Sequence, residues 1–388
     1  MQLIPARCHY RNVVLELITS IHARPQRMVM NFAGAGSQAL AWLHSVGGSS
    51  NTILEATDRY TPASLIEALG FKPEHFTSVD VARELALKGL LRARTLEPKE
   101  PHIFGVGCTA TIATNRSKRG EHRCVVAVAS VLGTATYELT LSKGIRKREA
   151  EENLVSLVIL KAVADAKGVL CHPELDLQEN EELQQDFVPS QIFARFISGE
   201  LSWIGIQPTD GSLITGETPK CVGILSGSFH PLHQGHLGLA EAATEFLNLP
   251  VCFELPLENA EKEPLSPFEV WRRVGQFASQ GLLILTRESL FVRKAELFTN
   301  SVFVIGADTA TRVLDPRFYN KDQAALLSAL SNLTKQGIRF LVASRRCDGE
   351  VLSLADINVP AGFEQLFEAL PENIFCMDVS SSEIRENW

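Results

Sequence analysis

Hydrophobic positions recur with two different periods in the first part of the chain. Helical spacing predicts helices over 37–46, 63–69 and 79–91, and a long helix over 147–167. Short apolar runs predict buried strands over 103–106, 124–131 and 136–141. Helices and strands mixed in this way are typical of an α/β layer fold. We therefore predict one α/β domain over residues 1–170.

In the second half, apolar strand runs and helical patterns alternate regularly. The predicted strands are 222–225, 251–255, 282–286, 302–305, 340–343 and 374–379, and the predicted helices are 237–246, 267–278 and 324–336. This alternation predicts a parallel sheet covered on both faces, a doubly wound or Rossmann-like domain over 219–388. Ligands bind such sheets beyond the carboxyl ends of the strands.

An acidic, glutamine-rich run separates these two patterns. It occupies 176–186 and is typical of a solvated helix or linker. We therefore predict a linker over 171–218. The chain has 388 residues, enough for two domains that each bury a core.

Composition narrows the class of protein. A net charge of -8 argues against a general binder of nucleic acids or membrane surfaces. The apolar runs are too short to span a bilayer. Eight scattered cysteines, without a CxxC pair or a secretory signal, predict reduced thiols in a cytoplasmic protein.

The main candidate for a functional site is the stretch of sequence that ends at His236. A short apolar strand is broken at Gly227, and a helical pattern follows, so the sequence predicts a strand, a tight turn and a helix. The first N–H groups of such a helix are unpaired and its dipole is positive there, which suits phosphate. His233 and His236 are three residues apart with Gly235 between them, so both imidazoles can face one anion.

Two other interpretations of this turn remain open. Histidines at 230, 233 and 236 could bind a metal ion, since imidazole is a common metal ligand. No cysteine or carboxylate lies nearby at ligand spacing, and a glycine-rich turn suits phosphate better, so we predict no metal site. The turn could also be structural, with incidental histidines.

A second stretch, residues 378–385, favours the phosphate-binding interpretation over the other two. After a predicted strand, three serines supply a cap and hydroxyl donors, and Arg385 follows one turn later. Alone it would be an ordinary capping box from Ser380 to Glu383. Together with the histidine turn, it predicts a second anion-binding helix start.

These stretches resemble a known superfamily. Residues 227–236 resemble the GxFxPxHxGH motif of HxGH nucleotidyltransferases, and 379–385 the ISSTxIR motif of nicotinate and nicotinamide mononucleotide adenylyltransferases. Between them, 302–308 resembles that family's strand and GAD segment, and 339–345 its later strand ending in arginine. The order of the four segments matches, over about 219–388.

The resemblance implies transfer of AMP from ATP to a phosphate acceptor, nicotinamide or nicotinate mononucleotide, with release of pyrophosphate. No protein nucleophile is required, and Mg²⁺ would be carried by the ATP phosphates. The implied residues are His233, His236 and Arg385 for catalysis, Gly227, Ser228, Phe229, Gly235, Asp308, Ser381 and Ser382 for the nucleotide, and Lys262 and Arg272 for the acceptor phosphate.

Alternatives to this activity stay open. The histidine turn does not select the acceptor, so transfer to phosphopantetheine or cytidylyl transfer to a phosphoalcohol remains possible. The chain could also be a catalytically decayed nucleotide-binding regulator or scaffold. Family members continue past the ISSTxIR helix whereas only three residues follow Arg385 here, so we expect this arginine to be weakly held.

The first half resembles another family, the C-terminal domain of the competence-damage-inducible protein CinA, which has nicotinamide mononucleotide deamidase activity. The matching segments are 34–43, 47–50, 60–70 and 105–109. The family's serine nucleophile and a nearby lysine correspond to Asn31 and Leu65 here, and neither can do that chemistry. We therefore expect an inactive domain that serves in assembly of a homo-oligomer or still binds a nucleotide.

Overall fold

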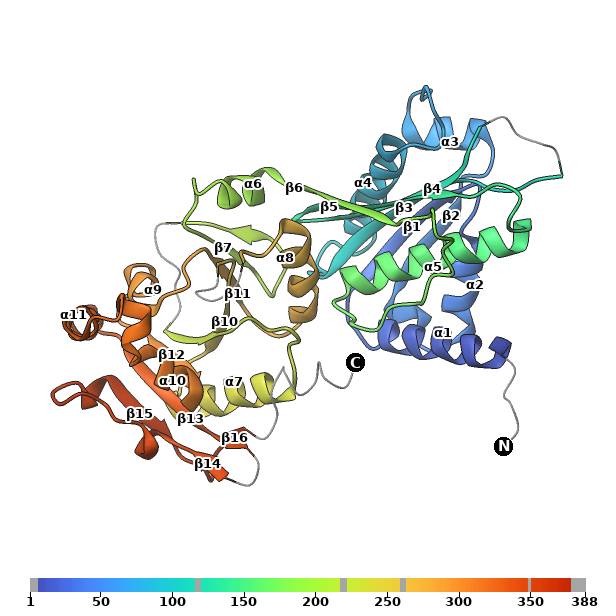
Figure 1. The fold of residues 1–388 in the computed structure, drawn as a ribbon. Coiled ribbons are helices and arrows are strands. Elements are labelled where there is room, and N and C mark those ends of the chain that lie inside the picture. Colours follow the sequence, from blue (N-terminus) through green and yellow to red (C-terminus); the bar gives the residue numbers. More distant parts are fainter. Residues whose placement is uncertain (1–5, 116–119, 217–221, 259–262, 348–349, 378–388) are drawn as a thin grey trace, which may run out of the picture. The chain divides into compact units, whose positions relative to one another are not determined.

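The computed structural model describes residues 6–115, 120–216, 222–258, 263–347 and 350–377. The chain divides into two compact units (Figure 1). The first unit comprises Met1–Ala194, Thr209–Ser212 and Pro267–Ser279, and the second comprises Arg195–Pro208, Leu213–Ser266 and Gln280–Trp388.

Both units are mixtures of helices and strands, as predicted. The first contains α1 (Ala6–His22), β1 (Arg27–Ala33), α2 (Ser37–Ser45), η1 (Ser49–Asn51), β2 (Ile53–Asp58), α3 (Pro62–Leu69), α4 (Val79–Leu96), β3 (Ile103–Thr111), β4 (His122–Ser130), β5 (Gly133–Leu141), α5 (Arg148–Ala166), β6 (Gln184–Pro189), α8 (Pro267–Val274) and η2 (Gly275–Phe277).

The sheet of the first unit runs in the order β2-β1-β3-β4-β5-β6. Strands β2, β1 and β3 are parallel, and the later neighbours are antiparallel. Helix α4 packs closely on this sheet because β3 carries glycines where they meet. A Cβ added at Gly105 would lie 2.0 Å from Ala86 O, and one at Gly107 2.2 Å from Ala82 O.

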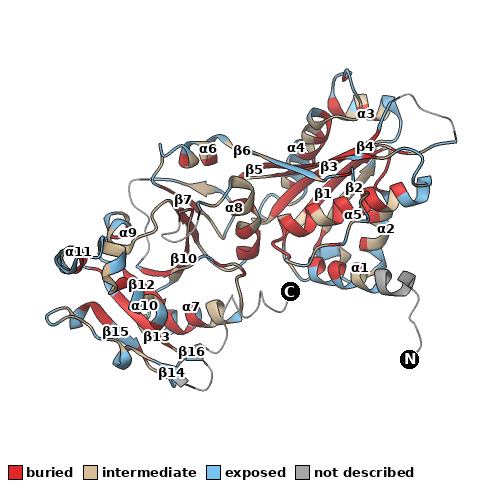
Figure 2. Ribbon diagram, in the orientation of Figure 1, coloured by how far each residue is buried: buried red, intermediate tan, exposed pale blue. Residues whose placement is uncertain are grey.

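Helix α5 covers the opposite face of the sheet from α4 (Figure 1). It packs against β3, β4 and β5 and also against α1 and α2. Nearly all its residues from Leu154 to Asp165 are buried, and buried residues gather on it and on the central strands (Figure 2). A helix that is apolar on most sides belongs inside a core.

Elements of the second unit follow the predicted alternation. They are β7 (Trp203–Ile206), β8 (Leu213–Ile214), β9 (Gly223–Ser226), α7 (Gln234–Leu247), β10 (Val251–Pro256), β11 (Leu283–Thr286), α9 (Phe291–Leu297), β12 (Val302–Gly306), α10 (Ala307–Val313), η3 (Pro316–Tyr319), α11 (Gln323–Lys335), β13 (Arg339–Cys347), β14 (Glu350–Leu352), η4 (Leu354–Asp356), η5 (Glu364–Leu366), β15 (Phe367–Leu370) and β16 (Cys376–Met377), while α6 (Gln191–Ile197) spans the boundary.

The central strands of this sheet are parallel, in the order β13-β12-β9-β10-β11. Antiparallel strands β7, β8 and β14 extend its edges. Ile224, Phe303 and Phe340 form a buried cluster with residues of α9, α10 and α11. Neighbouring strand residues point to the other face, where Phe253 lies against α7. The fold class is therefore α/β in both units, with a Rossmann-like sheet in the second.

The order of strands reverses between β9 and β12. From β9 the chain passes through α7 to β10 on one side, whereas from β12 it passes through α10 to β13 on the other. In doubly wound sheets this switch point is where ligands bind. The histidine turn follows β9 directly, so the topology places it at this crevice.

Several details differ from the sequence predictions. Strands β1 and β2 were not predicted, and the predicted linker 171–218 contains β6, β7 and β8. The segment Pro267–Ser279 returns to the first unit because Phe268 and Trp271 pack with Tyr137 and Phe187. The compact units thus differ from the predicted domains 1–170 and 219–388.

One cysteine prediction is wrong. Cys252, which is buried in β10, takes part in a disulfide. Cys108, Cys124, Cys171 and Cys376 are free thiols, as predicted for all the cysteines.

Candidate functional site

His233 and His236 are held together at the first turn of α7. His233 is the N-cap residue, and its Nδ1 accepts a hydrogen bond from the Gly235 N–H at 3.1 Å. His236 Nδ1 accepts from the His233 N–H at 3.3 Å. The two ring centroids are 3.8 Å apart, with the planes tilted by 32°. The sequence prediction that both imidazoles share one location is consistent with this pairing.

These hydrogen bonds fix the tautomer of each neutral imidazole. Because Nδ1 accepts in both rings, the proton of the neutral form is on Nε2. Burial, followed by the charge of His233, lowers the pKa of His236 to about 3. His236 is therefore neutral at pH 7 and offers an anion an N–H donor rather than a positive charge.

The backbone donors of this helix start are less open than the sequence suggested. The Gly235 N–H is bound to His233, and the His236 N–H donates to His233 O at 2.9 Å. A phosphate at this helix end would therefore meet imidazole N–H groups, or would compete with His233 for the Gly235 N–H.

Phe229 is buried and packs against the histidine turn. Its side chain is 1% exposed, and its ring contacts the rings of His236 and Phe253 edge-on, with centroids 5.0 and 5.8 Å apart. A Cβ at Gly227 would lie 3.0 Å from the Phe229 ring, so glycine leaves room for it. The Gly227 N–H donates to Glu254 O at 3.1 Å, which ties the turn to β10.

The GAD-like segment lies at the same edge of the sheet. β12 pairs with β9, with Val304 opposite Leu225. Gly306, the last residue of β12, and the histidine turn after β9 therefore both lie at the carboxyl ends of neighbouring strands. Asp308, in the first turn of α10, accepts a 2.7 Å hydrogen bond from Arg345 Nη1 on β13. The side chain of Asp308 is half exposed and remains accessible to a ligand.

A buried polar cluster beneath the turn was not predicted. Glu254 is fully buried, and its Oε2 accepts from Lys294 Nζ at 2.7 Å and from Ser226 Oγ at 2.5 Å. Lys294 Nζ also donates to Ser226 Oγ at 2.6 Å, and Thr286 Oγ1 donates to Glu254 Oε1. The cluster joins the ends of β9, β10 and β11 to α9, directly before the histidine turn.

The sequence did contain a signal for this cluster. Glu254 interrupts an otherwise apolar strand, and a carboxylate inside a buried strand requires a partner. The partner, Lys294, is 40 positions away on a different element. Only the fold identifies it.

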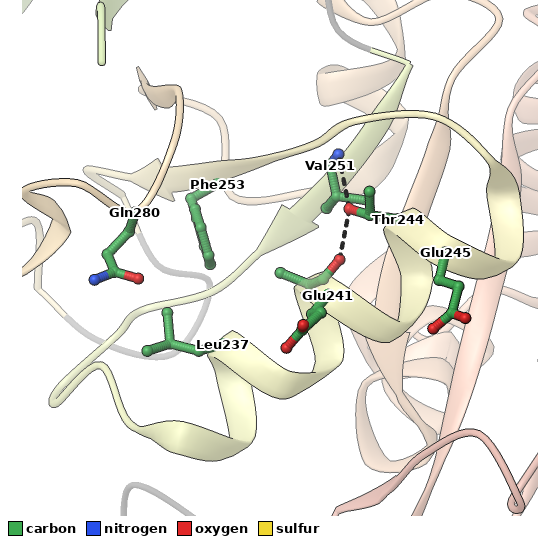
Figure 3. Close-up of a pocket in the computed structure, with 8 residues that line it drawn as sticks. Leu237, Glu241, Thr244, Glu245, Val251, Phe253 and Gln280 are labelled. Carbon is green, nitrogen blue, oxygen red and sulfur yellow. Dashed lines mark hydrogen bonds between the residues drawn. The ribbon is translucent and has the colours of Figure 1, made fainter. Parts of the chain in front are cut away.

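A groove runs along α7 beside the histidine turn (Figure 3). It has a volume of about 490 Å³, and its lining residues are Leu237, Ala240, Glu241, Thr244, Glu245, Val251, Phe253 and Gln280. Among the described residues, two carboxylates and no basic side chain line it. The groove is therefore unsuited to the phosphates of a nucleotide.

Arg272 does not lie where the sequence placed it. The residue belongs to the first unit, and its Nε donates to the buried carboxylate of Asp165 at 2.7 Å. Nη1 pairs with Glu269 at 3.1 Å, and Nη2 lies 2.9 Å from His172 Nε2. Two carboxylates already neutralise this guanidinium, so it is not available to an acceptor phosphate.

Other predicted residues lie outside the described parts of the chain. They are Lys262, Ser381, Ser382 and Arg385. The described chain ends at Met377, which pairs with Arg345 in a parallel ladder. Ser228 immediately follows Gly227 in the turn.

In the first unit, Asn31 and Leu65, which correspond to the deamidase nucleophile and lysine, are both packed inside the protein. Asn31 is buried in β1, and its Nδ2 donates to Leu85 O at 3.3 Å. Leu65 is packed in an apolar cluster with Ala33, Leu69 and Val81.

The glycine turn before α2 is also occupied by the chain itself. Glu152 Oε1 accepts from the Gly36 N–H at 2.9 Å, the Gln38 N–H at 3.1 Å and Ser37 Oγ at 3.1 Å. A carboxylate of the protein thus already fills this anion position.

Within the described residues, no three or more histidine, cysteine, aspartate or glutamate side chains are grouped so as to hold a metal ion. None of the helices in the same residues is long and apolar enough to span a membrane.

Comparisons with known proteins give a likeness to one group of structures. No family model and no curated protein matches the chain. Competence/damage-inducible protein CihA from Agrobacterium tumefaciens is 18% identical, with 41% of this chain and 99% of that chain covered and a TM-score of 0.32. A CinA superfamily protein from Escherichia coli is 15% identical over 42% of this chain and 91% of that chain, also with a TM-score of 0.32.

A protein from Enterobacter asburiae described as competence or damage-inducible is similar to the same extent. It is 13% identical over 39% of this chain and 94% of that chain, with a TM-score of 0.32. These proteins carry the name of the family that the first half of the sequence resembles. At such low identity and TM-scores they support no statement about activity.

Proposed function

We propose that the second unit is an adenylyltransferase that moves AMP from ATP to a phosphate acceptor and releases pyrophosphate. One observation carries the proposal. Two imidazoles, whose Nδ1 atoms each accept a backbone hydrogen bond, are paired at the N-terminus of α7 where the strand order reverses. Such a crevice suits the phosphates of a nucleotide.

The chemistry asks little of the protein. An oxygen of the acceptor phosphate attacks the α-phosphorus of ATP in line, and the bond from that phosphorus to the bridging oxygen of the β-phosphate breaks. Pyrophosphate leaves with the electron pair. The protein must align the two phosphates and stabilise charge on the leaving group.

Each residue has a defined part in this proposal. His233 and His236 donate hydrogen bonds to the triphosphate, and Gly227 to Phe229 shape the turn around it. Asp308 accepts a hydrogen bond from Arg345 and would also accept hydrogen bonds from the sugar or base. Mg²⁺ would arrive on the ATP phosphates and help to neutralise the departing pyrophosphate.

Four residues outside the described parts complete the proposal. Ser381 and Ser382 would contact the outer phosphates, and Arg385 would neutralise the pyrophosphate charge. Lys262 is the remaining candidate for the acceptor phosphate, since Arg272 is paired within the first unit.

Nicotinamide or nicotinate mononucleotide is the proposed acceptor. This choice of acceptor rests on the sequence resemblance of residues 227–236 and 379–385 to enzymes that use those acceptors. The first unit is proposed to lack deamidase activity, because Asn31 and Leu65 stand where that chemistry needs a nucleophile and a base. Enzymatic release of ammonia from nicotinamide mononucleotide would contradict this second point.

A product assay tests the function. The full chain would be incubated with ATP, Mg²⁺ and one acceptor at a time: nicotinamide mononucleotide, nicotinate mononucleotide or 4′-phosphopantetheine. We expect pyrophosphate and a dinucleotide in equal amounts with a pyridine mononucleotide. Product from phosphopantetheine alone would reassign the acceptor. A separate reaction would contain CTP and a phosphoalcohol. If the chain binds ATP but no pyrophosphate forms in any of these reactions, the result would favour a nucleotide-binding regulator.

A further inference from the structure

A second pocket lies entirely within the first unit. It has a volume of about 350 Å³ and lies between α3 and α4 on one side and β1 and β2 on the other. The lining residues are Val29, Asn31, Glu55, Arg59, Ala68, Leu85, Lys88 and Arg92. Three of them are cationic and one is anionic, so the lining has an excess of positive charge.

Glu55 neutralises one of the three cations. Arg92 Nη2 lies 2.7 Å from Glu55 Oε2, and Arg92 Nε lies 3.1 Å from the same oxygen. This fork-like contact fixes both side chains. The Arg92 guanidinium lowers the pKa of Glu55, and the charge of Arg59 contributes to a smaller extent.

The other two cations are less well satisfied. Lys88 pairs with Glu84, one helical turn away, at 3.4 Å, and both side chains are more than one-third exposed. Within the described residues, Arg59 makes no ion pair, and its Nε is buried without a hydrogen-bond partner. A buried guanidinium N–H without an acceptor is costly unless a ligand or water supplies one.

A buried amide gives independent support. Asn31 is only 7% exposed and lines the pocket, and its Nδ2 donates a long 3.3 Å bond to Leu85 O. An asparagine can make four hydrogen bonds, so this side chain has capacity left for a ligand in the pocket.

We propose that this pocket binds a small organic anion, with its phosphate or carboxylate on Arg59 and Lys88 and a hydroxyl-bearing body on Asn31. The apolar side chains of Val29, Ala68 and Leu85 would pack against the body. The volume is at the lower end for small-molecule sites, which favours a compact ligand such as a phosphorylated sugar. The site is separate from the glycine turn that Glu152 fills.

Calorimetric titration of the full chain at low ionic strength tests the proposal. The probes are ribose 5-phosphate, inorganic phosphate, succinate and uncharged ribose. We expect ribose 5-phosphate to bind, ribose not to bind, and affinity to fall as salt is raised. Tighter binding of succinate than of ribose 5-phosphate would assign a carboxylate ligand, and the reverse would assign a phosphate. Binding of none of the charged probes would overturn the proposal.

Substitutions locate the binding. Lys88→Gln and Arg59→Gln should each lower the affinity for the probe by about tenfold or more, since each removes a charge-assisted contact. Lys72→Gln, which removes an exposed lysine of the same unit, should change nothing. His236→Ala should also leave this binding unchanged, because the nucleotide site is in the other unit.

The variants also separate this site from the proposed enzyme site. Loss of binding in His236→Ala, with full binding in Lys88→Gln, would move the anion to the nucleotide site and overturn the proposal. The side chain of Lys88 is 39% exposed, so its substitution should preserve folding, which circular dichroism checks. If Arg59→Gln fails to fold, the result with Lys88→Gln decides.

Discussion

At the scale of single residues, His236 shows how geometry sets chemistry. A histidine beside a phosphate is usually considered as a cation, yet burial and the neighbouring His233 hold the pKa of His236 at about 3. The backbone hydrogen bond at Nδ1 leaves the proton of the neutral ring on Nε2. The ring is therefore a fixed donor that needs no protonation to bind an anion.

Replacing His236 by alanine should reduce adenylyl transfer by roughly two to four decades. The reason is the loss of a donor that is positioned for charge in the transition state. Turnover of the full chain with ATP and a pyridine mononucleotide measures this effect. His75→Ala is the matched control, because that histidine is 77% exposed in the first unit and should leave turnover unchanged. Equal rates for both variants would place the site elsewhere.

The pKa of His236 also predicts how stability depends on pH. The unfolded chain protonates this group near 6.5, but the folded protein only near 3. Between these values the unfolded state binds more protons, so stability is lost as pH falls from 6.5 towards 3. Urea unfolding of the wild type and of His236→Asn at pH 7.5 and 4.5 measures this. We expect a smaller acid-induced loss in the variant, and equal losses would contradict the assigned burial.

At the scale of elements, the cluster of Ser226, Glu254, Thr286 and Lys294 locks three strand ends to one helix. Its members come from β9, β10, β11 and α9, and they satisfy one another in a space from which water is largely excluded. The histidine turn begins at the residue after Ser226. The position of that turn therefore depends on the buried ion pair between Glu254 and Lys294.

Breaking this pair on one side should be costly. Lys294→Met leaves Glu254 buried and unpaired, which we expect to destabilise the second unit by about 3–5 kcal/mol. The double variant Lys294→Met with Glu254→Gln should recover part of that loss, since the uncompensated charge is gone. Urea unfolding of the singles and the double forms the cycle. Additive losses would show that the two side chains do not act as a pair.

A buried lysine at the end of α5 predicts a pH dependence of the same sign in a more alkaline range. Lys167 is fully buried and donates to Ile21 O at 2.9 Å and Thr52 Oγ1 at 2.8 Å. Burial, followed by the charge of Arg24, lowers its pKa to about 7 from 10.5. Between pH 7 and 10.5 the unfolded chain binds more protons, so stability should rise with pH.

The Lys167→Met variant isolates this effect. Thermal unfolding of the first unit at pH 7 and pH 9.5 should show a rise in melting temperature for the wild type and a smaller rise for the variant. An identical rise in both proteins would contradict the burial of a titrating amine.

Elements with a strong period were predicted well. The long helix α5 and the strands around the switch point match the apolar runs, because burial on both faces leaves a plain hydrophobic signal. β1 was missed because it begins with Arg27 and its apolar run is interrupted by Asn31. β6 was missed because its residues are mostly exposed along an antiparallel edge.

At the scale of the whole molecule, the sequence order hides which pieces pack together. The segment Pro267–Ser279 belongs to the first unit although it lies inside the second half of the chain. Its helical period was visible, but a period does not say which core the apolar face will join. Arg272 was misplaced for the same reason.

The candidate site shows the same division between local and long-range information. The histidine turn is a local motif, and its strand, turn and helix could be predicted from fifteen consecutive residues or so. The neighbourhood of Asp308 and Arg345 required the order of strands β9, β12 and β13. The partner of Glu254 required the full fold.

A crystal structure of the full chain with Mg²⁺ and an ATP analogue that cannot be cleaved between the α- and β-phosphates tests the central claim most directly. We predict phosphate oxygens within hydrogen-bond distance of Nε2 of His233 and His236, with the sugar near Asp308. Triphosphate density away from the N-terminus of α7 would contradict the account.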